Sequence, residues 1–201
     1  MRFFNLFIVG AVVLSLTSCG PRAFVKGTYD ENVESENLLN DQWSETDMQV
    51  AVKELVDKMV YTTRAYGNAN SNRQPIVMIT KLQNKTSEHI DTESIMDMLR
   101  VELTSNGQVQ FVDKQARGDI AEEYDYQEGT VTESTKSKRG SQVGADYVLN
   151  GRLDSIVQEA GKKKTVYYKL TLNLTNLKTG LIAWTDHKQI RKLYRKQHVG
   201  M

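Results

Sequence analysis

The sequence predicts an α+β fold in which a mixed β-sheet has helices packed on it. In the first part of the folded region, apolar residues at helical spacing alternate with short apolar runs. The last third instead shows three consecutive strand patterns separated by turn residues, as in an antiparallel meander. About 155 residues are available for this domain, which is enough for one hydrophobic core. Helices with short strands first and a meander last are typical of the α+β class.

The first expected helix begins near Ser44 and ends at Gly67-Asn68. Ser44 is a favourable N-cap, and the acidic residues just after it suit the positive end of a helix dipole. The apolar residues that recur at helical spacing are Met48, Val52, Leu55, Val56, Met59 and Val60. One side of this helix is therefore expected to pack on the sheet.

Two short strands flank a second helix. The apolar run over residues 76–79 predicts a buried strand, and a polar loop is expected at 83–86. Asp91 is a plausible N-cap for a helix with one apolar face, and Asn106-Gly107 stops that helix. Residues 109–112 then predict a second short strand.

The middle of the chain is charged and its pattern is weaker. Residues 119–126 predict a charged helix that ends at Gly129. The Ser/Thr/Lys-rich segment 130–142 is expected to be part loop and part weak helix running to Val143. A turn at 144–146 then leads into the sheet.

Three strands close the domain. They are expected at residues 147–159, 166–174 and 182–190, with turns at 161–164 and 178–180. The strand 166–174 alternates apolar and polar residues most cleanly, which is typical of a sheet with one face in water.

Residues 1–18 have the features of a bacterial signal peptide. Met1-Arg2 is a short positive region, and the apolar stretch over 3–15 is too short for a comfortable membrane span. Leu16-Thr17-Ser18-Cys19 resembles the bacterial lipobox, whose cysteine carries acyl chains such as palmitate after cleavage. We therefore predict lipidation at Cys19; an uncleaved anchor or a plain secretory signal is the alternative. Two or three acyl chains hold a protein firmly on a membrane.

The residue after the cysteine and the segment that follows predict where the domain works. Gly20 is not Asp, and by the usual sorting rule this resembles a lipoprotein of the outer membrane, facing the periplasm. Residues 19–44 are acidic and polar with few large apolar side chains, which predicts a flexible tether. The folded domain is then expected over residues 45–201.

No catalytic, metal or cofactor site is visible in the sequence. Cys19 is the sole thiol, and His89, His187 and His198 are scattered without zinc-ligand spacing. Phosphate-binding loops, dinucleotide fingerprints and nucleophile elbows do not occur. The acidic group at Glu122-Glu123 and Asp125 is interpreted as a solvated helix face. We predict a protein that is not an enzyme, and a net charge of +1 gives no field that favours nucleic acid.

Two further groups of residues have an open interpretation. The basic run consists of Lys188, Arg191, Lys192, Arg195 and Lys196. It could touch anionic lipid, glycan strands or an acidic partner, but a solvated edge strand is the favoured interpretation. Trp184 is expected in the core or at its edge. The tyrosines at 124, 126, 147, 167 and 168 exceed what a small core needs, and exposed ones would suit a protein interface.

Several segments of the folded region together resemble a known family. In chain order they are Arg73-Gln74-Pro75-Ile76-Val77, Asn84-Lys85-Thr86, Asp91 to Leu99, Val109-Gln110-Phe111-Val112-Asp113, Gly144 to Gly151, Tyr168-Lys169-Leu170-Thr171-Leu172, Thr179-Gly180 and Trp184. Their order on a lipoprotein resembles the LpoB-type penicillin-binding protein activators. The resemblance spans residues 46–195.

This resemblance implies a fold like the N-terminal domain of TolB. It also implies an outer-membrane lipoprotein that binds a bifunctional peptidoglycan synthase in the periplasm, activates it allosterically and so regulates cell-wall synthesis and cell shape. No contact residue is carried over, because the matching motifs look like fold determinants.

One departure from the family keeps a second hypothesis open. Well-known members have a long, Pro-rich arm, whereas this one is short, acidic and almost without proline. The alternative is a structural or accessory lipoprotein subunit of an envelope or secretion complex, since such proteins share the fold.

Overall fold

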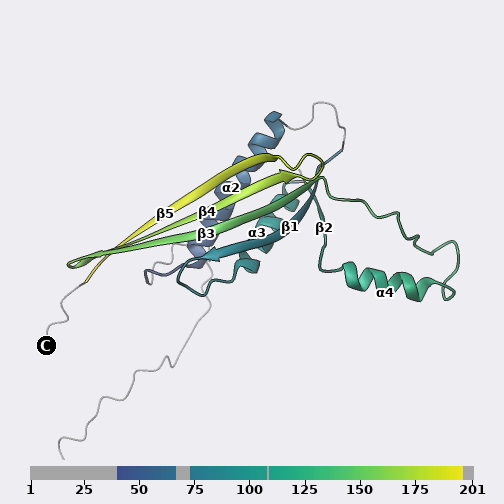
Figure 1. The fold of residues 1–201 in the computed structure, drawn as a ribbon, viewed down its shortest axis with the longest axis horizontal. Coiled ribbons are helices and arrows are strands. Elements are labelled where there is room, and N and C mark those ends of the chain that lie inside the picture. The colour runs from purple at the N-terminus through teal and green to yellow at the C-terminus, as the bar shows by residue number, and fades with distance from the viewer. Residues whose placement is uncertain (1–39, 67–72, 108, 197–201) are drawn as a thin grey trace, which may run out of the picture. The chain divides into compact units, whose positions relative to one another are not determined.

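The computed structural model confirms the α+β class. It describes residues 40–66, 73–107 and 109–196, and within them a five-stranded mixed sheet carries helices on one face (Figure 1). The predictions for residues 1–39, including the signal peptide and Cys19, lie outside the described residues. The resemblance to TolB stays a prediction.

The sheet has the strand order β2-β1-β3-β4-β5. Strand β1 (Ile76–Lys85) is parallel to β2 (Gln110–Val112) on one side and to β3 (Tyr147–Ala160) on the other. Strands β3, β4 (Lys163–Asn176) and β5 (Ile182–Arg195) form the predicted antiparallel meander. The parallel and antiparallel halves therefore meet at β3.

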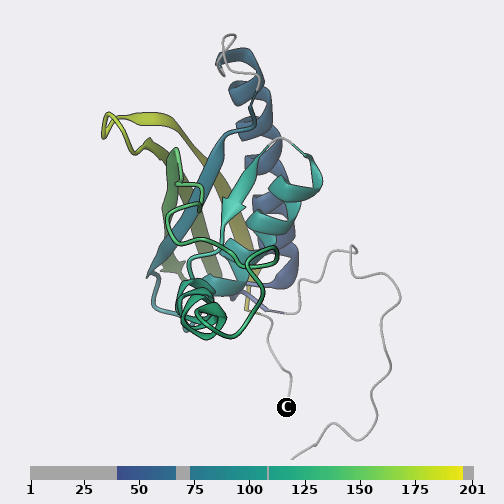
Figure 2. The same cartoon turned by 90° about the vertical axis from the view of Figure 1, so that its right-hand side faces the viewer.

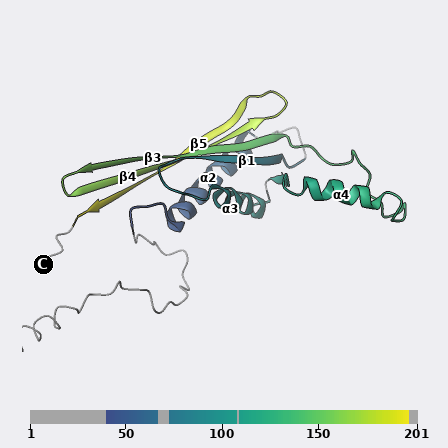
Figure 3. The same ribbon diagram turned by 60° about the horizontal axis from the view of Figure 1, so that its bottom comes forward.

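Helices α2 (Glu45–Tyr66) and α3 (Thr92–Ser105) lie side by side on the same face of the sheet (Figures 2 and 3). Helix α2 packs on β5 and α3 packs on β1, and the two helices also contact each other. Among the described residues, no helix covers the opposite face. Helix α4 (Arg117–Gln127) extends away from the sheet and buries none of its own residues.

Both packed helices begin at the predicted caps. The Asp91 carboxylate accepts hydrogen bonds from the backbone N–H groups of Glu93 (3.0 Å) and Ser94 (3.3 Å). Ser44 and Asp47 form a reciprocal capping box: the Ser44 N–H donates to Asp47 Oδ2 (2.9 Å), and the Asp47 N–H donates to Ser44 Oγ (3.4 Å). None of the helices in the described ranges combines the length and apolar character needed to cross a bilayer.

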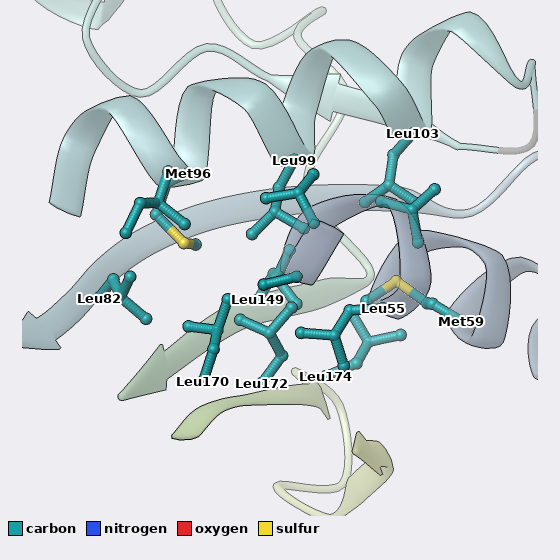
Figure 4. Packing of buried hydrophobic residues seen from close by; sticks show 14 of the residues in the cluster. Leu55, Met59, Leu82, Met96, Leu99, Leu103, Leu149, Leu170, Leu172 and Leu174 are labelled. Carbon is teal, nitrogen blue, oxygen red and sulfur yellow. The ribbon is translucent and has the colours of Figure 1, made fainter. Parts of the chain in front are cut away.

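One apolar cluster lies between the two helices and the sheet (Figure 4). Leu55 of α2 and Leu99 of α3 meet Leu149, Leu170 and Leu172 of the sheet, and each of these side chains is almost completely buried. Trp184 is also buried at the edge of this cluster, as predicted. Close packing of this kind supplies most of the favourable free energy of folding.

A glycine lets two of the central strands approach closely. A Cβ atom at Gly151 would lie 2.4 Å from the carbonyl oxygen of Thr171 on β4 and 2.9 Å from a methyl carbon of Leu82 on β1. No side chain fits in this space, so only glycine allows this packing.

The structure corrects several local predictions. The turn expected at 161–164 is too long, because β4 begins at Lys163, and the last strand runs to Arg195 because it pairs with β4 to that point. The polar loop expected at 83–86 is wrong for its first three residues, because β1 continues through Lys85 in parallel register with β3. A polar strand end is stable there because the sheet ladder supplies its backbone hydrogen bonds. The weak helix expected within 130–142 is absent, and that segment forms turns. The hydroxyl groups of Thr132 and Thr135 are hydrogen-bonded to each other, and the Thr135 hydroxyl also donates to the Thr132 carbonyl. Such local bonds compete with helix formation.

Candidate docking sites at the two ends of the sheet

The histidines and acidic residues singled out in the sequence do not come together. His89 is exposed in the loop between β1 and α3, His187 is exposed on β5, and His198 lies outside the described residues. Glu122, Glu123 and Asp125 are exposed on α4, as expected for a solvated helix face. Within the described ranges, no group of three His, Cys, Asp or Glu side chains could hold a metal ion.

The basic run of β5 is divided by the alternation of the strand. Lys188 and Lys192 point toward α2, where Lys188 pairs with Glu54 and Lys192 with Asp47. The Lys192 and Asp47 side chains are only 4% and 5% exposed, and their N and O atoms are 2.5 Å apart. The favoured interpretation as a solvated edge is therefore wrong for Lys192. Lys192 is buried because Asp47, an acidic residue of the α2 cap, faces it and neutralises its charge.

Residues 40–44, which we call the strap, are bound to the sheet through their backbone. Tyr194 Oη donates to the carbonyl of Asn40, and Tyr168 Oη donates to the carbonyl of Asp41 (3.3 Å). Lys192 Nζ donates to the carbonyl of Gln42 (2.6 Å). Three successive carbonyls are thus held by side chains of β4 and β5. The last residues of the expected tether are in contact with the domain.

Tyr168 is the central side chain beneath the strap. Its ring is completely buried and meets the Trp43 ring edge-on, with 5.3 Å between the ring centroids. Its single hydroxyl hydrogen is shared between the Asp41 carbonyl and Glu88, whose other carboxylate oxygen accepts the backbone N–H of Trp43 (2.9 Å). Burial, followed by the hydrogen bond with Glu88, raises the pKa of the Tyr168 hydroxyl far above its usual value. The hydroxyl therefore remains a hydrogen-bond donor at any physiological pH.

An ion pair between Asp41 and Lys164 also holds the strap on the sheet. The Asp41 carboxylate pairs with Lys164 at the start of β4. This hydrogen-bonded contact lowers the pKa of Asp41 and raises the pKa of Lys164. Both side chains are partly in water, so the pair contributes modestly to stability.

The opposite end of β4 and β5 carries exposed apolar residues. Leu177, Leu181 and Ile182 flank the connecting turn and are 49%, 70% and 59% exposed. The turn itself is well defined, since the Asn176 side chain accepts hydrogen bonds from two backbone N–H groups and Gly180 takes a positive φ of 72°. We call these three exposed side chains the turn patch. Apolar groups gathered on an ordered turn are a feature of protein-docking sites.

The strap and the turn patch lie at opposite ends of the same strands. Strand β4 has 14 residues, so at about 3.3 Å per residue it is roughly 45 Å long. The strap contacts it between Lys164 and Tyr168, and the turn patch follows its last residue. A chain held at the strap therefore presents the turn patch at the far end.

Sequence reasoning identified neither surface. The polar composition of the strap predicts part of a tether, although Trp43 is a signal that this segment packs against other residues. Leu177 and Leu181 directly flank the predicted turn at 178–180. Side chains beside a hairpin turn lie beyond the core, so their position in the sequence indicates that they are exposed.

The sequence matches a protein-family model over most of the described domain. The model described as peptidoglycan-synthase activator LpoB matches residues 47–190. No curated protein matches the chain.

Several solved structures are similar to the chain. The C-terminal domain of LpoB from Escherichia coli has 19% identity and a TM-score of 0.44, with 72% of this chain and 98% of that chain covered. Lipoprotein GNA1162 from Neisseria meningitidis has 14% identity and a TM-score of 0.39, with 62% and 88% covered. The PelC dodecamer from Paraburkholderia phytofirmans has 16% identity and a TM-score of 0.34, with 63% and 79% covered.

Proposed function

The chain belongs to the family of the peptidoglycan-synthase activator LpoB, and on this basis we propose that it binds a bifunctional peptidoglycan synthase, a penicillin-binding protein, and activates it. The match over residues 47–190 is the observation that carries this proposal, since it spans nearly the whole described domain. The protein acts as a regulator with no cofactor and no catalysis of its own.

We further propose that the protein is anchored to the outer membrane by lipid at Cys19 and faces the periplasm. The lipobox sequence and Gly20 support this location. The acyl chains keep the domain on its membrane, while the residues between Cys19 and the strap set its reach.

Activation requires a difference in affinity between two states of the synthase. A ligand shifts such an equilibrium only by binding one conformer more tightly than the other. A tenfold increase in the ratio of active to inactive synthase requires that the active conformer be bound more tightly by about 1.4 kcal/mol. A few well-placed apolar contacts supply a free energy of this size.

The turn patch is the proposed docking site for the synthase. It lies at the end of the sheet remote from the strap, so a partner approaching from the opposite membrane meets it first. Its three large apolar side chains are solvent-exposed on an ordered turn. Because the turn is already ordered, it loses little conformational entropy when it binds a partner.

The first test is affinity capture from an envelope extract. The bait is the chain from residue 19 onward with Cys19→Ser, which keeps the strap and every described residue. Recovery of a bifunctional penicillin-binding protein, together with faster glycan polymerisation when the bait is added to that enzyme, is the expected result. Recovery of the bait alone as an oligomer, or of secretion components, would contradict the proposal and favour the structural-subunit hypothesis.

Variants of the turn patch locate the docking site. Leu177→Ser with Leu181→Ser is expected to weaken binding to the synthase by about tenfold or more. Val101→Ser is the matched control, because Val101 is a 60% exposed apolar residue on α3. If both variants bind equally well, the turn patch is not the docking site.

A further inference from the structure

Basic residues gather at the end of the sheet where the strap is bound. The β3–β4 hairpin turn and the end of β5 meet there. The Lys196 backbone N–H donates to the carbonyl of Lys162 (2.8 Å), and Lys163 lies directly opposite Arg195 in the strand register. We call this region the ribbon tip. Its cations are Lys162, Lys163, Lys164, Arg195 and Lys196.

Within residues 40–66, 73–107 and 109–196, fewer acidic side chains take part in ion pairs at the ribbon tip than the tip has cations. Lys164 pairs with Asp41 and Glu159, and Lys196 pairs with Glu159 (3.4 Å). The other three cations, which are Lys162, Lys163 and Arg195, are exposed and make no ion pair with any described residue. Like charges opposite each other in a sheet repel, as Lys163 and Arg195 do. An anionic surface would relieve this repulsion.

Apolar side chains lie beside these cations. Leu193 is 68% exposed, two residues before Arg195 on β5. Ile156, on the same face of the sheet in the neighbouring part of β3, is 56% exposed. Cations next to exposed apolar side chains are the combination that suits a lipid–water interface, where the charges meet headgroups and the apolar groups enter the acyl boundary.

The strap connects the ribbon tip to the expected lipid anchor. Asn40 and Asp41 are bound by Tyr194 and Lys164, which belong to this same end of the sheet. Only residues 20–39 separate the strap from Cys19. A fully extended chain of that length spans no more than about 70 Å, and a flexible one averages about 25 Å. The chain that follows Cys19 therefore joins the described domain beside the ribbon tip.

We propose that the ribbon tip binds the anionic phospholipid headgroups of the membrane that carries the lipid anchor. This inference rests on the proposed lipid anchoring but not on the identity of the synthase. Charge complementarity and the attachment of the strap at the tip favour a lipid surface over a glycan strand. Docking by the tip turns the other end of the sheet, with the turn patch, away from the membrane and toward a partner.

The test measures binding of the chain from residue 19 onward, with Cys19→Ser, to lipid vesicles by co-sedimentation. This chain contains the whole core and cannot be acylated, so any binding comes from the polypeptide and not from an acyl chain. We expect binding to vesicles in which about a third of the lipid is phosphatidylglycerol, little binding to phosphatidylcholine vesicles, and loss of binding at high salt. The triple variant Lys162→Gln, Lys163→Gln, Arg195→Gln is expected to bind about 100-fold more weakly, at roughly fivefold per cation.

A second triple variant controls for net charge. Lys81→Gln, Lys114→Gln, Lys178→Gln removes three exposed cations elsewhere and is expected to bind as the parent does. Equal loss in both variants would overturn the proposal, because binding would then follow net charge alone. Binding to peptidoglycan sacculi that needs the tip cations, without binding to anionic vesicles, would overturn it in favour of glycan. Synthase capture by the tip variant is measured separately, so failure of the two proposals is distinguishable.

Discussion

The buried ion pair between Lys192 and Asp47 allows a demanding test of how the strap end is stabilised. Replacing Lys192 by Met keeps an unbranched side chain of similar volume but removes the charge. The Asp47 carboxylate then remains buried without its cation, and the Gln42 carbonyl loses its donor. The strap and the start of α2 are both expected to loosen.

The expected cost follows from the burial of the pair. Removing one partner of a buried ion pair typically costs about 3–5 kcal/mol. Asp47 keeps two hydrogen bonds from Ser44, at 2.9 and 3.0 Å, so we expect the lower end, about 3 kcal/mol. Lys188→Met is the matched control, because Lys188 lies on the same face of β5 and pairs with Glu54, but these side chains are 22% and 38% exposed. That variant is expected to cost no more than about 1 kcal/mol.

Urea unfolding monitored by circular dichroism measures both costs. With a slope of about 1–3 kcal/mol per molar urea, the Lys192→Met midpoint is expected to fall by at least about 1 M. Adding Asp47→Asn to Lys192→Met removes both charges and is expected to recover part of the loss. Equal midpoints for Lys192→Met and Lys188→Met, or additive losses in the double variant, would refute the reasoning.

Three further predictions concern single positions. Gly151→Ala is expected to cost at least about 1–3 kcal/mol, since the added Cβ meets a β4 backbone oxygen that cannot move without opening the sheet; Gly144→Ala, which has open space, is the control, and thermal unfolding measures both. In an alkaline absorbance titration, Tyr168→Phe is expected to leave the native tyrosine signal unchanged, because burial raises the Tyr168 pKa so far that it ionises only on unfolding; a reduced native amplitude would contradict this. Because Lys164 lowers the pKa of Asp41, their pair contributes fully above the ordinary Asp value of about 3.9 and is lost as pH falls through the folded-state value. The stability difference between the parent and Lys164→Gln is therefore expected to be constant from pH 7 to about 5 and to shrink by about pH 3; a constant difference down to that pH would show that the pair is not formed.

The helices and the meander could be predicted because their signals are local. The apolar spacing from Met48 to Val60 and the alternation over 166–174 each lie within one element. Side-chain caps such as Asp91 are likewise set by neighbours two or three residues away. The extension of β1 through Lys85 was missed because its polar residues are held by pairing with β3, which is distant in sequence.

The candidate docking sites depend on contacts between distant residues. The strap needs Tyr168, Lys192 and Tyr194 to reach the carbonyls of residues 40–42, and no local pattern encodes such partners. The basic run looked uniform in the sequence, yet the sheet divides it into buried Lys192 and exposed Arg195.

The sequence by itself determined the α+β class, the core positions in α2 and β4 and the LpoB family. These follow from periodicity and capping residues, which depend only on residues close together in the chain, and from motif order, which can be read along it. Only the tertiary structure decided that β1 lies between β2 and β3, that Lys192 is buried against Asp47, and that the strap and the turn patch occupy opposite ends of the sheet. The physical reason is that burial and charge pairing depend on which distant residues are brought together, and that follows from the packing of whole elements.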